Sequence, residues 1–368
     1  MSSKYEDELG LIVMDNCKSL GDKIDQNIMQ RRSKKDSFII PTNLVRFNNG
    51  EGKAVIEDSV RDKDLYIISD IGNHSMTYKM YGYINHMGPD EHFMDIKRVI
   101  SAVRGQADRV TVVMPLLYES RQHRRKGRES LDCALALQEL QNLGVSTIVT
   151  FDVHDPNIQN AVPTSMSFEN FYPTNTILKE FIKNEEFDPE TVKFISPDTG
   201  AMDRAKYYAN MFQADVGMFH KRRDYSKIVD GKNPIVAHNY LGGNLEGETA
   251  IVVDDMIASG TSMLEVAEDL KKRGVRKVFL ISTFSMFTNG LECFNKAFEE
   301  GLFEKLYSTN LTYVDKDALT KPWYEQIDCS NYASDIINTL NTSGSISELK
   351  NGKQKILTML EKKKNGEL

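Results

Sequence analysis

The 368-residue sequence has little cysteine, a single tryptophan and no long apolar run. Its four cysteines (Cys17, Cys133, Cys293 and Cys329) are far apart and form no CxxC pair. This spacing argues against a disulfide framework and a structural zinc site, and it fits a reducing compartment. The first ten residues lack a signal-peptide pattern, and no apolar run approaches the roughly 18 residues of a membrane span. We therefore expect a cytoplasmic protein with no membrane partner.

An excess of positive charge is also absent. The chain has 46 Lys and Arg against 53 Asp and Glu, which gives a formal net charge of −7. The molecule as a whole therefore lacks the basic surface that binding to nucleic acid requires. Hydrophobic residues (40 %) and charged residues (27 %) occur in the proportions of an ordinary globular protein. A phosphate-binding enzyme of this composition would need its cations concentrated locally.

What the sequence does contain is a repeated alternation of apolar runs and amphipathic segments. The clearest runs are residues 110–114, 146–151, 192–196, 250–253 and 277–282. They are apolar throughout, which is typical of strands buried on both faces of a parallel sheet. Since the length suits two hydrophobic cores, we predict two similar α/β domains, each with a parallel sheet flanked by helices.

We expect three parts along the chain. Residues 1–168 form an N-terminal α/β domain, and residues 169–329 form a C-terminal domain of the same type. Residues 330–368 form a helix and a Lys-rich tail that packs on the N-terminal domain. Residues 78–92 are rich in Gly, Met and aromatic residues without a clear period, so we interpret them as an inserted surface segment.

The most informative stretch is AIVVDDMIASGTS at residues 250–262. A buried strand ends in two acids, and a turn of small hydroxyl residues then opens a helix. Backbone N–H groups at the start of a helix bind a phosphate dianion, and glycine allows close approach. The two carboxylates cannot bind that phosphate, but they suit vicinal sugar hydroxyls or a metal held by them. The stretch predicts a ribose 5-phosphate site made of Asp254, Asp255, Ala258, Ser259, Gly260, Thr261 and Ser262. The alternative is an ordinary turn in which the acids cap the helix.

This loop resembles the signature loop shared by phosphoribosyltransferases and ribose-phosphate pyrophosphokinases, and further segments resemble the pyrophosphokinases alone. MPLLYESRQHRRKGR at residues 114–128 is a strand end followed by a basic loop. It resembles the loop with which that family binds the triphosphate of ATP, where Arg121 and Gln122 match an Arg-Gln pair. By itself the basic loop could be a solvated charged face or a nonspecific nucleic-acid patch.

A second segment, TFDVH at residues 150–154 followed by Ile158 and Gln159, resembles the family's Asp-Leu-His…Ile-Gln segment. The resemblance implies that His154 helps to bind Mg²⁺ with ATP. On chemistry alone this assignment is unusual, because Mg²⁺ prefers oxygen ligands. A histidine after a strand is more often a hydrogen-bonded structural residue.

A third segment, SPDTGAMDR at residues 196–204, resembles the family's Ser-Pro-Asp turn, and Asp198 matches its second metal-linked acid. Downstream, FHKRR at residues 219–223 resembles a His-Lys-x-Arg strand. The resemblance implies that Lys221 is the catalytic lysine and that Arg223 contacts the reacting phosphates. Fixed cations of this kind stabilise the charge that develops during diphosphoryl transfer. Alternatively, these cations only mark a surface strand.

A weaker match, FNNGE at residues 47–51, resembles the family's adenine-binding element, which comes from a neighbouring subunit. It implies that Phe47 packs on the base and that Asn49 and Glu51 bond to its edge. It also implies a homo-oligomer, a hexamer in most of the family. Alone, the segment would be interpreted as a hairpin turn.

The resemblance covers about residues 40–350 and is imperfect. Ala258 stands where the family usually has an acid, and His123 replaces the aspartate after Arg-Gln. The chain is therefore identified as a divergent member of the ribose-phosphate pyrophosphokinase family. This implies an Mg²⁺-dependent enzyme that converts ATP and ribose 5-phosphate into phosphoribosyl diphosphate and AMP, at the carboxyl ends of the strands where the domains meet.

Two alternatives stay open at this point. A phosphoribosyltransferase would share the loop around Asp254, but it would not need the Arg121 and Phe47 segments. A non-catalytic regulatory homologue is favoured by the departures at Ala258 and His123. The presence of His154, Lys221 and Arg223 argues against that second alternative.

Overall fold

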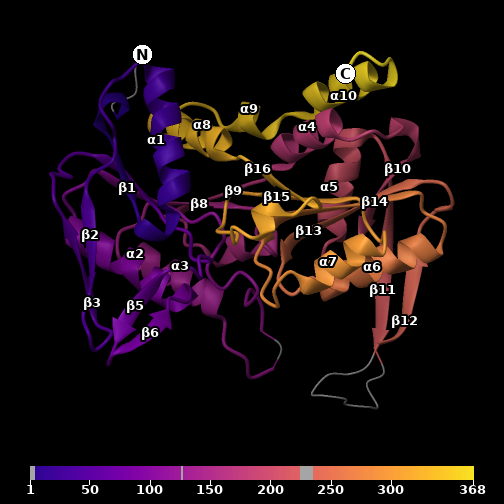
Figure 1. Cartoon of the computed structure of the whole chain (residues 1–368). Coiled ribbons are helices and arrows are strands. Elements are labelled where there is room, and N and C mark those ends of the chain that lie inside the picture. Colours follow the sequence, from indigo (N-terminus) through magenta and orange to yellow (C-terminus); the bar gives the residue numbers. More distant parts are fainter. Residues whose placement is uncertain (1–4, 126, 224–234) are drawn as a thin grey trace. The chain divides into compact units, whose positions relative to one another are not determined.

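The computed structural model describes residues 5–125, 127–223 and 235–368 (Figure 1). The chain divides into two compact units. Unit 1 consists of Met1–Pro173, Asn310–Asp315 and Asp328–Lys350, and unit 2 consists of Thr174–Thr309, Lys316–Ile327 and Asn351–Leu368. No helix among the described residues combines the length and the apolar composition that a membrane span would need.

Unit 1 is built on a five-stranded parallel sheet. Its strands, in spatial order, are β1 (Leu9–Val13), β4 (Asp64–Ile68), β7 (Arg109–Val113), β8 (Thr147–Phe151) and β9 (Ser167–Phe171). Its helices include α1 (Lys18–Arg32), α2 (Pro89–Val103), α3 (Asp132–Asn142), α8 (Ser330–Asn341) and α9 (Ser347–Lys350). In β7 and β8, where the apolar runs 110–114 and 146–151 predicted strands, every residue after the first is buried, as expected of strands covered on both faces.

Two antiparallel hairpins stand apart from this sheet. One pairs β2 (Thr42–Arg46) with β3 (Gly52–Ile56), and the other pairs β5 (Thr77–Met80) with β6 (Tyr83–His86). The second hairpin accounts for most of residues 78–92, the segment interpreted as an insertion. Its tip is exposed and apolar, because it carries Tyr81, Tyr83 and Ile84.

Unit 2 is built on a seven-stranded sheet. Its strands, in spatial order, are β12 (Ile235–Leu241), β11 (Asp215–Arg223), β10 (Val192–Ser196), β13 (Thr249–Ile257), β14 (Lys277–Ser285), β15 (Lys305–Thr309) and β16 (Tyr324–Ile327). Only the β11–β12 pair is antiparallel among these described strands. Its helices include α4 (Thr174–Asn184), α5 (Met202–Phe212), α6 (Thr261–Lys272), α7 (Glu292–Glu299) and α10 (Lys353–Lys364). Together with unit 1, this confirms the prediction of α/β domains with parallel sheets.

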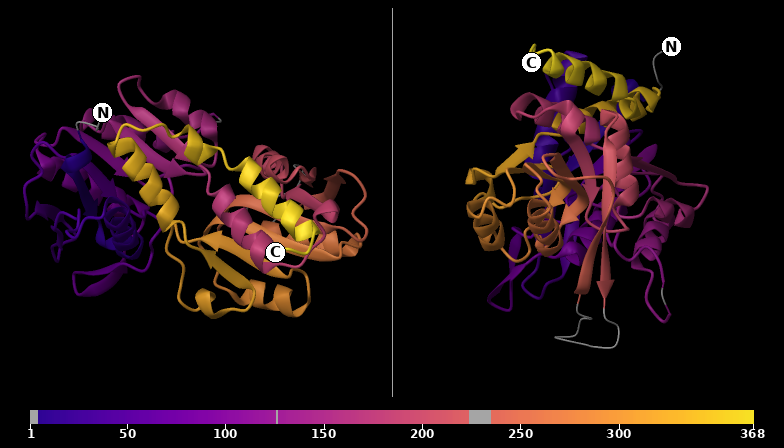
Figure 2. Two further views of the ribbon diagram at one scale, coloured as in Figure 1. Left: turned by 90° about the horizontal axis from the view of Figure 1, so that it is seen from above. Right: turned by 90° about the vertical axis from the view of Figure 1, so that its right-hand side faces the viewer.

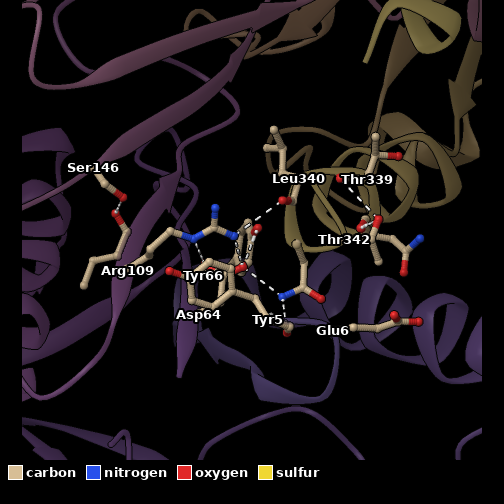
Figure 3. Close-up of polar contacts among 12 residues, drawn as sticks. Tyr5, Glu6, Asp64, Tyr66, Arg109, Ser146, Thr339, Leu340 and Thr342 are labelled. Carbon is tan, nitrogen blue, oxygen red and sulfur yellow. Dashed lines mark hydrogen bonds and ion pairs between the residues drawn. The ribbon is translucent and has the colours of Figure 1, made fainter. Parts of the chain in front are cut away.

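A buried polar network attaches α8 to the amino-terminal end of the unit 1 sheet (Figure 3). The fully buried Asp64 accepts two hydrogen bonds from the Arg109 guanidinium, at 2.9 and 2.6 Å. Asn341 at the end of α8 donates to the same carboxylate (2.8 Å), and so does the Tyr66 hydroxyl (3.1 Å). A buried carboxylate is stable only when it is paired and hydrogen-bonded in this way. Residues 330–341 are therefore an integral part of unit 1.

The last helix packs in unit 2 instead. Figure 2 shows α10 alongside α4. Gly352, just before α10, contacts Asn175 so closely that a β-carbon at this position would overlap the Asn175 amide. The segment predicted as one C-terminal part, residues 330–368, is thus shared between the two units.

Candidate active site

The predicted sugar-phosphate loop lies between β13 and α6 in unit 2. The strand does not end at the two acids, because its pairing with β14 continues through Asp254 and Met256 to Ile257. The turn that follows contains Ala258, Ser259 and Gly260. Helix α6 begins at Thr261, and Ser262 is its second residue. Gly260 has φ +82°, and a β-carbon there would overlap the Phe294 ring. The turn therefore requires glycine, and it presents the positive end of a 12-residue helix.

The side chains of this turn are hydroxyl-rich. Ser259 and Thr261 stand at the start of α6. Their hydroxyl oxygens lie 3.2 Å apart. The exposed thiol of Cys293 on α7 is 3.8 Å from the Ser259 carbonyl oxygen. Hydroxyl donors at a helix start are the groups that bind a phosphate dianion. The turn therefore has the kinds of group that the predicted phosphate site requires, and its ligand stays a prediction.

The two acids form a pair with Arg204 of α5. The guanidinium Nη1 is 3.7 Å from Asp254 Oδ1 and 3.7 Å from Asp255 Oδ1. Burial raises the pKa of Asp254 well above its usual range, and the negative charge of Asp255 adds to the rise, whereas Arg204 opposes it. The buried Asp255 and the partly exposed Asp254 thus share one guanidinium. This arrangement favours a further cation or hydroxyl donors at the pair.

Arg204 was not assigned a role from the sequence. It ends the SPDTGAMDR segment, so the signal was present, but the pattern did not show that the side chain reaches the two acids. Periodicity places residues on a face of a helix, whereas the contact between Arg204 and Asp254 joins residues that are fifty positions apart. The structure therefore adds a residue to the candidate site.

Asp198 lies in the turn between β10 and α5. Its Oδ1 accepts hydrogen bonds from the backbone N–H groups of Gly200 (2.7 Å) and Ala201 (3.1 Å), while the residue as a whole stays exposed. Because β10 and β13 are parallel neighbours, their carboxyl ends lie at the same edge of the sheet. The charge of Asp198 also contributes, after the larger causes, to the raised pKa of Asp254. The structure thus brings Asp198 close to Asp254.

The predicted cations Lys221 and Arg223 lie at the end of β11. This strand pairs with β10 as far as Met218 and then continues, paired with β12, to Arg223. Both residues are therefore placed beyond the carboxyl end of β10, on the strand next to it. The side chains of residues 221–223 lie outside the described part of the structure, so their roles stay predictions.

In unit 1, the predicted ATP residues Arg121 and Gln122 lie in the loop that follows β7, and both are exposed. The start of this loop is fixed to β8, because the backbone N–H of Phe151 donates to the Pro115 carbonyl (3.0 Å). His154 lies just after β8, and its ring is 5.5 Å from the ring of His123. The structure thus places Arg121, Gln122 and His154 on adjacent loops at the carboxyl edge of one sheet.

Phe47, Asn49 and Glu51 form the turn between β2 and β3. The Asn49 amide donates to the Glu51 carboxylate (2.9 Å), and its oxygen accepts from the Glu51 backbone N–H (3.1 Å). The turn borders a hollow of about 470 Å³ whose other walls include Tyr78 and Met80 of the β5–β6 hairpin. The backbone N–H of Tyr81, in the turn of that hairpin, donates to the Asn48 carbonyl oxygen (2.8 Å).

The predicted site residues are thus distributed over both units. Phe47, Asn49, Glu51, Arg121, Gln122 and His154 belong to unit 1, and the remaining residues belong to unit 2. Among the described residues, no group of three or more His, Cys, Asp or Glu side chains is arranged to hold a metal ion. Mg²⁺ often binds through one or two protein ligands plus substrate phosphates and water. The exposed Asp198 carboxylate, an oxygen donor fixed by its own turn, fits such a role.

Two protein-family models match the chain. Residues 9–144 match the N-terminal domain of ribose phosphate pyrophosphokinase. Residues 174–287 match the phosphoribosyl transferase domain. The matched regions include the loops of Arg121 and Asp254.

Individual proteins give the same result. Ribose-phosphate pyrophosphokinase A of Dictyostelium discoideum is 26 % identical over 306 residues, covering 83 % of this chain and 88 % of that protein. Ribose-phosphate pyrophosphokinase 2 of Schizosaccharomyces pombe is 28 % identical over 309 residues, with the same coverage. The crystal structure of phosphoribosylpyrophosphate synthetase from Mycobacterium smegmatis superposes with a TM-score of 0.75 at 19 % identity, covering 92 % of this chain and all of that one.

Proposed function

We propose that this chain, which belongs to the ribose-phosphate pyrophosphokinase family, transfers the diphosphoryl group of ATP to the anomeric hydroxyl of ribose 5-phosphate. The products are phosphoribosyl diphosphate and AMP. The observation that carries the proposal is the acid pair Asp254–Asp255, followed directly by a helix-opening turn that requires Gly260. An acid pair beside a phosphate-type turn suits a sugar phosphate better than it suits either a free phosphate or a nucleobase.

Unit 2 supplies the sugar-phosphate site. The turn from Ala258 to Ser262 holds the 5-phosphate through the start of α6 and its hydroxyl groups. Asp254 and Asp255 accept hydrogen bonds from the ribose hydroxyls, which gives further donors to two carboxylates that share one guanidinium. The Arg204 guanidinium orients the pair and opposes the rise in the pKa of Asp254.

Unit 1 supplies the ATP site. Arg121 and Gln122 bind the polyphosphate from the loop after β7, since an exposed guanidinium forms bidentate bonds to phosphate oxygens. The turn with Phe47, Asn49 and Glu51 receives an adenine base. By resemblance to the family this base would belong to the ATP of a neighbouring subunit, which makes a homo-oligomer part of the proposal.

In the reaction, the anomeric oxygen of ribose 5-phosphate attacks the β-phosphorus of ATP in line. The bond between that phosphorus and the oxygen bridging to the α-phosphate breaks, so that AMP leaves with the bridging oxygen and the anomeric proton passes to solvent. Lys221 and Arg223 stabilise the charge on the transferred phosphates. Mg²⁺, held by ATP together with His154 and Asp198, would neutralise the polyphosphate. The four free cysteines support a reducing, cytoplasmic location.

The test is product formation by the purified full-length protein. With ATP, Mg²⁺ and ribose 5-phosphate, we expect AMP and phosphoribosyl diphosphate in equal amounts by mass spectrometry, and neither product when the sugar is omitted. Release of diphosphate from phosphoribosyl diphosphate in the presence of a nucleobase would favour a phosphoribosyltransferase. Absence of AMP at every Mg²⁺ and phosphate concentration would leave a non-catalytic homologue.

A further inference from the structure

His123 connects two loops of unit 1 that carry different parts of the proposed ATP site. Its Nε2 lies 3.1 Å from Asp155 Oδ2, and its Nδ1 lies 3.2 Å from the Ser120 carbonyl oxygen. Both ring nitrogens therefore face acceptor oxygens, and the side chain is only 10 % exposed. His123 directly follows Gln122, whereas Asp155 directly follows His154.

Asp155 is itself fixed in place. Its Oδ1 accepts hydrogen bonds from the backbone and side-chain nitrogens of Asn157, both at 2.9 Å, and so caps the 3-10 helix Pro156–Ala161. Oδ2 is the oxygen that faces His123. One carboxylate thus caps a helix with one oxygen and holds the neighbouring loop with the other.

The loop after β7 needs such an attachment. Its arginines at positions 121, 124, 125 and 128 are all exposed, and like charges in one loop repel one another. The first part of the loop is fixed by the Phe151–Pro115 backbone bond and by the Tyr118 hydroxyl, which donates to Asp90 (2.7 Å). His123 extends this attachment past the Arg121–Gln122 pair.

We propose that His123 is a positioning residue, which aligns Arg121 and Gln122 with His154 by tying their loop to Asp155. The identity of the ligand, the polyphosphate of ATP, rests on the proposed function. The tie itself rests on the contacts of His123 with Asp155 and with the Ser120 carbonyl. It acts on ATP binding and not on the sugar-phosphate turn, which belongs to unit 2.

The residue type at position 123 makes the proposal specific to this chain. The family motif that the loop resembles has an aspartate at this position. An aspartate here would meet the carboxylate of Asp155 at close range, and like charges at such a distance repel. We therefore expect that His123→Asp, although it restores the family's residue, impairs this protein more than the neutral His123→Leu.

The main experiment measures KM for each substrate in five variants of His123 and Asp155, His123→Asp included. His123→Leu removes both ring contacts, and Asp155→Asn weakens the tie but keeps a side chain that can cap the 3-10 helix. Each should raise KM for ATP about tenfold, with KM for ribose 5-phosphate unchanged, and the double variant should be no worse than either single one. His123→Gln, whose amide can still donate to Asp155, should recover KM for ATP to within about threefold of the wild-type value.

Lys63→Leu is the matched control. The Lys63 ammonium also ties two segments of unit 1, with its Nζ 2.9 Å from Glu8 Oε2, but Lys63 directly precedes β4 and so lies at the amino-terminal end of the sheet. We expect no change in either KM. Additive effects of the two single variants, equal rises in both KM values, or a His123→Asp variant as active as the wild type would each overturn the proposal.

A second measurement does not depend on catalysis. Amide hydrogen exchange in the peptide covering residues 116–125 of the unliganded protein should increase in His123→Leu and in Asp155→Asn, because the loop loses its attachment. It should stay unchanged in Lys63→Leu. If the wild type released no AMP but amide exchange rose in both variants, the proposed function would fail, whereas the contact between His123 and Asp155 would still be shown to hold the loop. Unchanged exchange would remove the tie whatever the activity.

Discussion

Gly260 packs against the ring of Phe294, and no side chain fits between them. A β-carbon at Gly260 would overlap two carbons of that ring, and the residue also has φ +82°. The start of α6 and the aromatic core under α7 are therefore fixed against each other. This contact determines where the backbone of the sugar-phosphate turn lies.

We expect Gly260→Ala to destabilise unit 2 by about 2 to 4 kcal/mol, because the strain of a positive φ adds to an overlap inside the core. Binding of ribose 5-phosphate should also weaken. Gly290→Ala is the matched control, since Gly290 has φ +77° but a β-carbon added there would meet nothing within 4 Å, and it should cost only about 1 kcal/mol. Guanidinium denaturation followed by the fluorescence of the single tryptophan, Trp323 of unit 2, measures both.

Arg204 should control the pH dependence of sugar binding. Burial and the neighbouring Asp255 raise the pKa of Asp254, and Arg204 opposes them. Removing the guanidinium in Arg204→Met should raise that pKa further, so the loss of kcat/KM for ribose 5-phosphate on acidification should begin at a higher pH than in the wild type. Lys206→Met, which removes an exposed lysine paired with Asp203, should leave the profile unchanged. Identical profiles in both variants would argue against the role of Arg204.

Asp70 should make unit 1 less stable as the pH rises. This buried carboxylate accepts hydrogen bonds from Thr312 Oγ1 (2.9 Å) and the Tyr313 backbone (2.6 Å), yet burial raises its pKa to about 6. The folded state therefore keeps the proton at pH values where the unfolded chain has lost it. Its contribution to stability is fully present below about pH 4 and is lost as the pH rises through 6, a change of about 3 kcal/mol.

The comparison of wild type with Asp70→Asn isolates this effect. The asparagine variant cannot titrate at this position, so the difference in unfolding free energy between the two proteins should decrease from pH 4 to pH 7. Circular dichroism follows both units during denaturation, whereas Trp323 reports on unit 2 and serves as the internal control. A constant difference across this range would show that Asp70 keeps its ordinary pKa.

Cys293 should react first with thiol reagents, and ribose 5-phosphate should protect it. It is the exposed cysteine next to the Ser259 carbonyl, whereas the other three are buried. Burial raises the pKa of the Cys133 thiol to about 12, which suppresses the reactive thiolate. Peptide mapping after brief treatment with iodoacetamide should find the label at Cys293, with a several-fold slower rate when the sugar phosphate is bound. ATP alone should not slow it.

The sequence was sufficient for the parts of the fold with continuous apolar runs. β7 and β13 appear where residues 110–114 and 250–253 predicted strands, since these runs are buried on both faces. The β5–β6 hairpin was not predicted, because its strands are short and its turn residues, Tyr81 and Gly82, both have positive φ. Two-residue hairpin turns of this kind usually carry Asn or Asp before the glycine. Because Tyr81 occupies that position, the sequence does not show the usual Asn-Gly or Asp-Gly pattern.

In the candidate site, too, some features could be predicted from the sequence and others could not. The turn after Asp255 could be predicted because glycine, hydroxyl residues and a helix start follow one another in the chain. The contacts of Arg204 with Asp254 and of His123 with Asp155 could not, since each joins segments far apart in sequence. Nothing in the local pattern of either segment determines which partner its side chain meets.

The bond between Asp64 and Asn341 has a consequence for how the protein is made on the ribosome. The two residues are 277 positions apart in the chain, and all of unit 2 up to Thr309 is synthesised between them. The unit 1 sheet must therefore emerge from the ribosome while Asp64 still lacks its hydrogen bond from Asn341. That bond forms only after the unit 2 sheet has been translated. A nascent chain stalled before Ser330 should expose unit 1 to proteases, and extension past Asn341 should protect it.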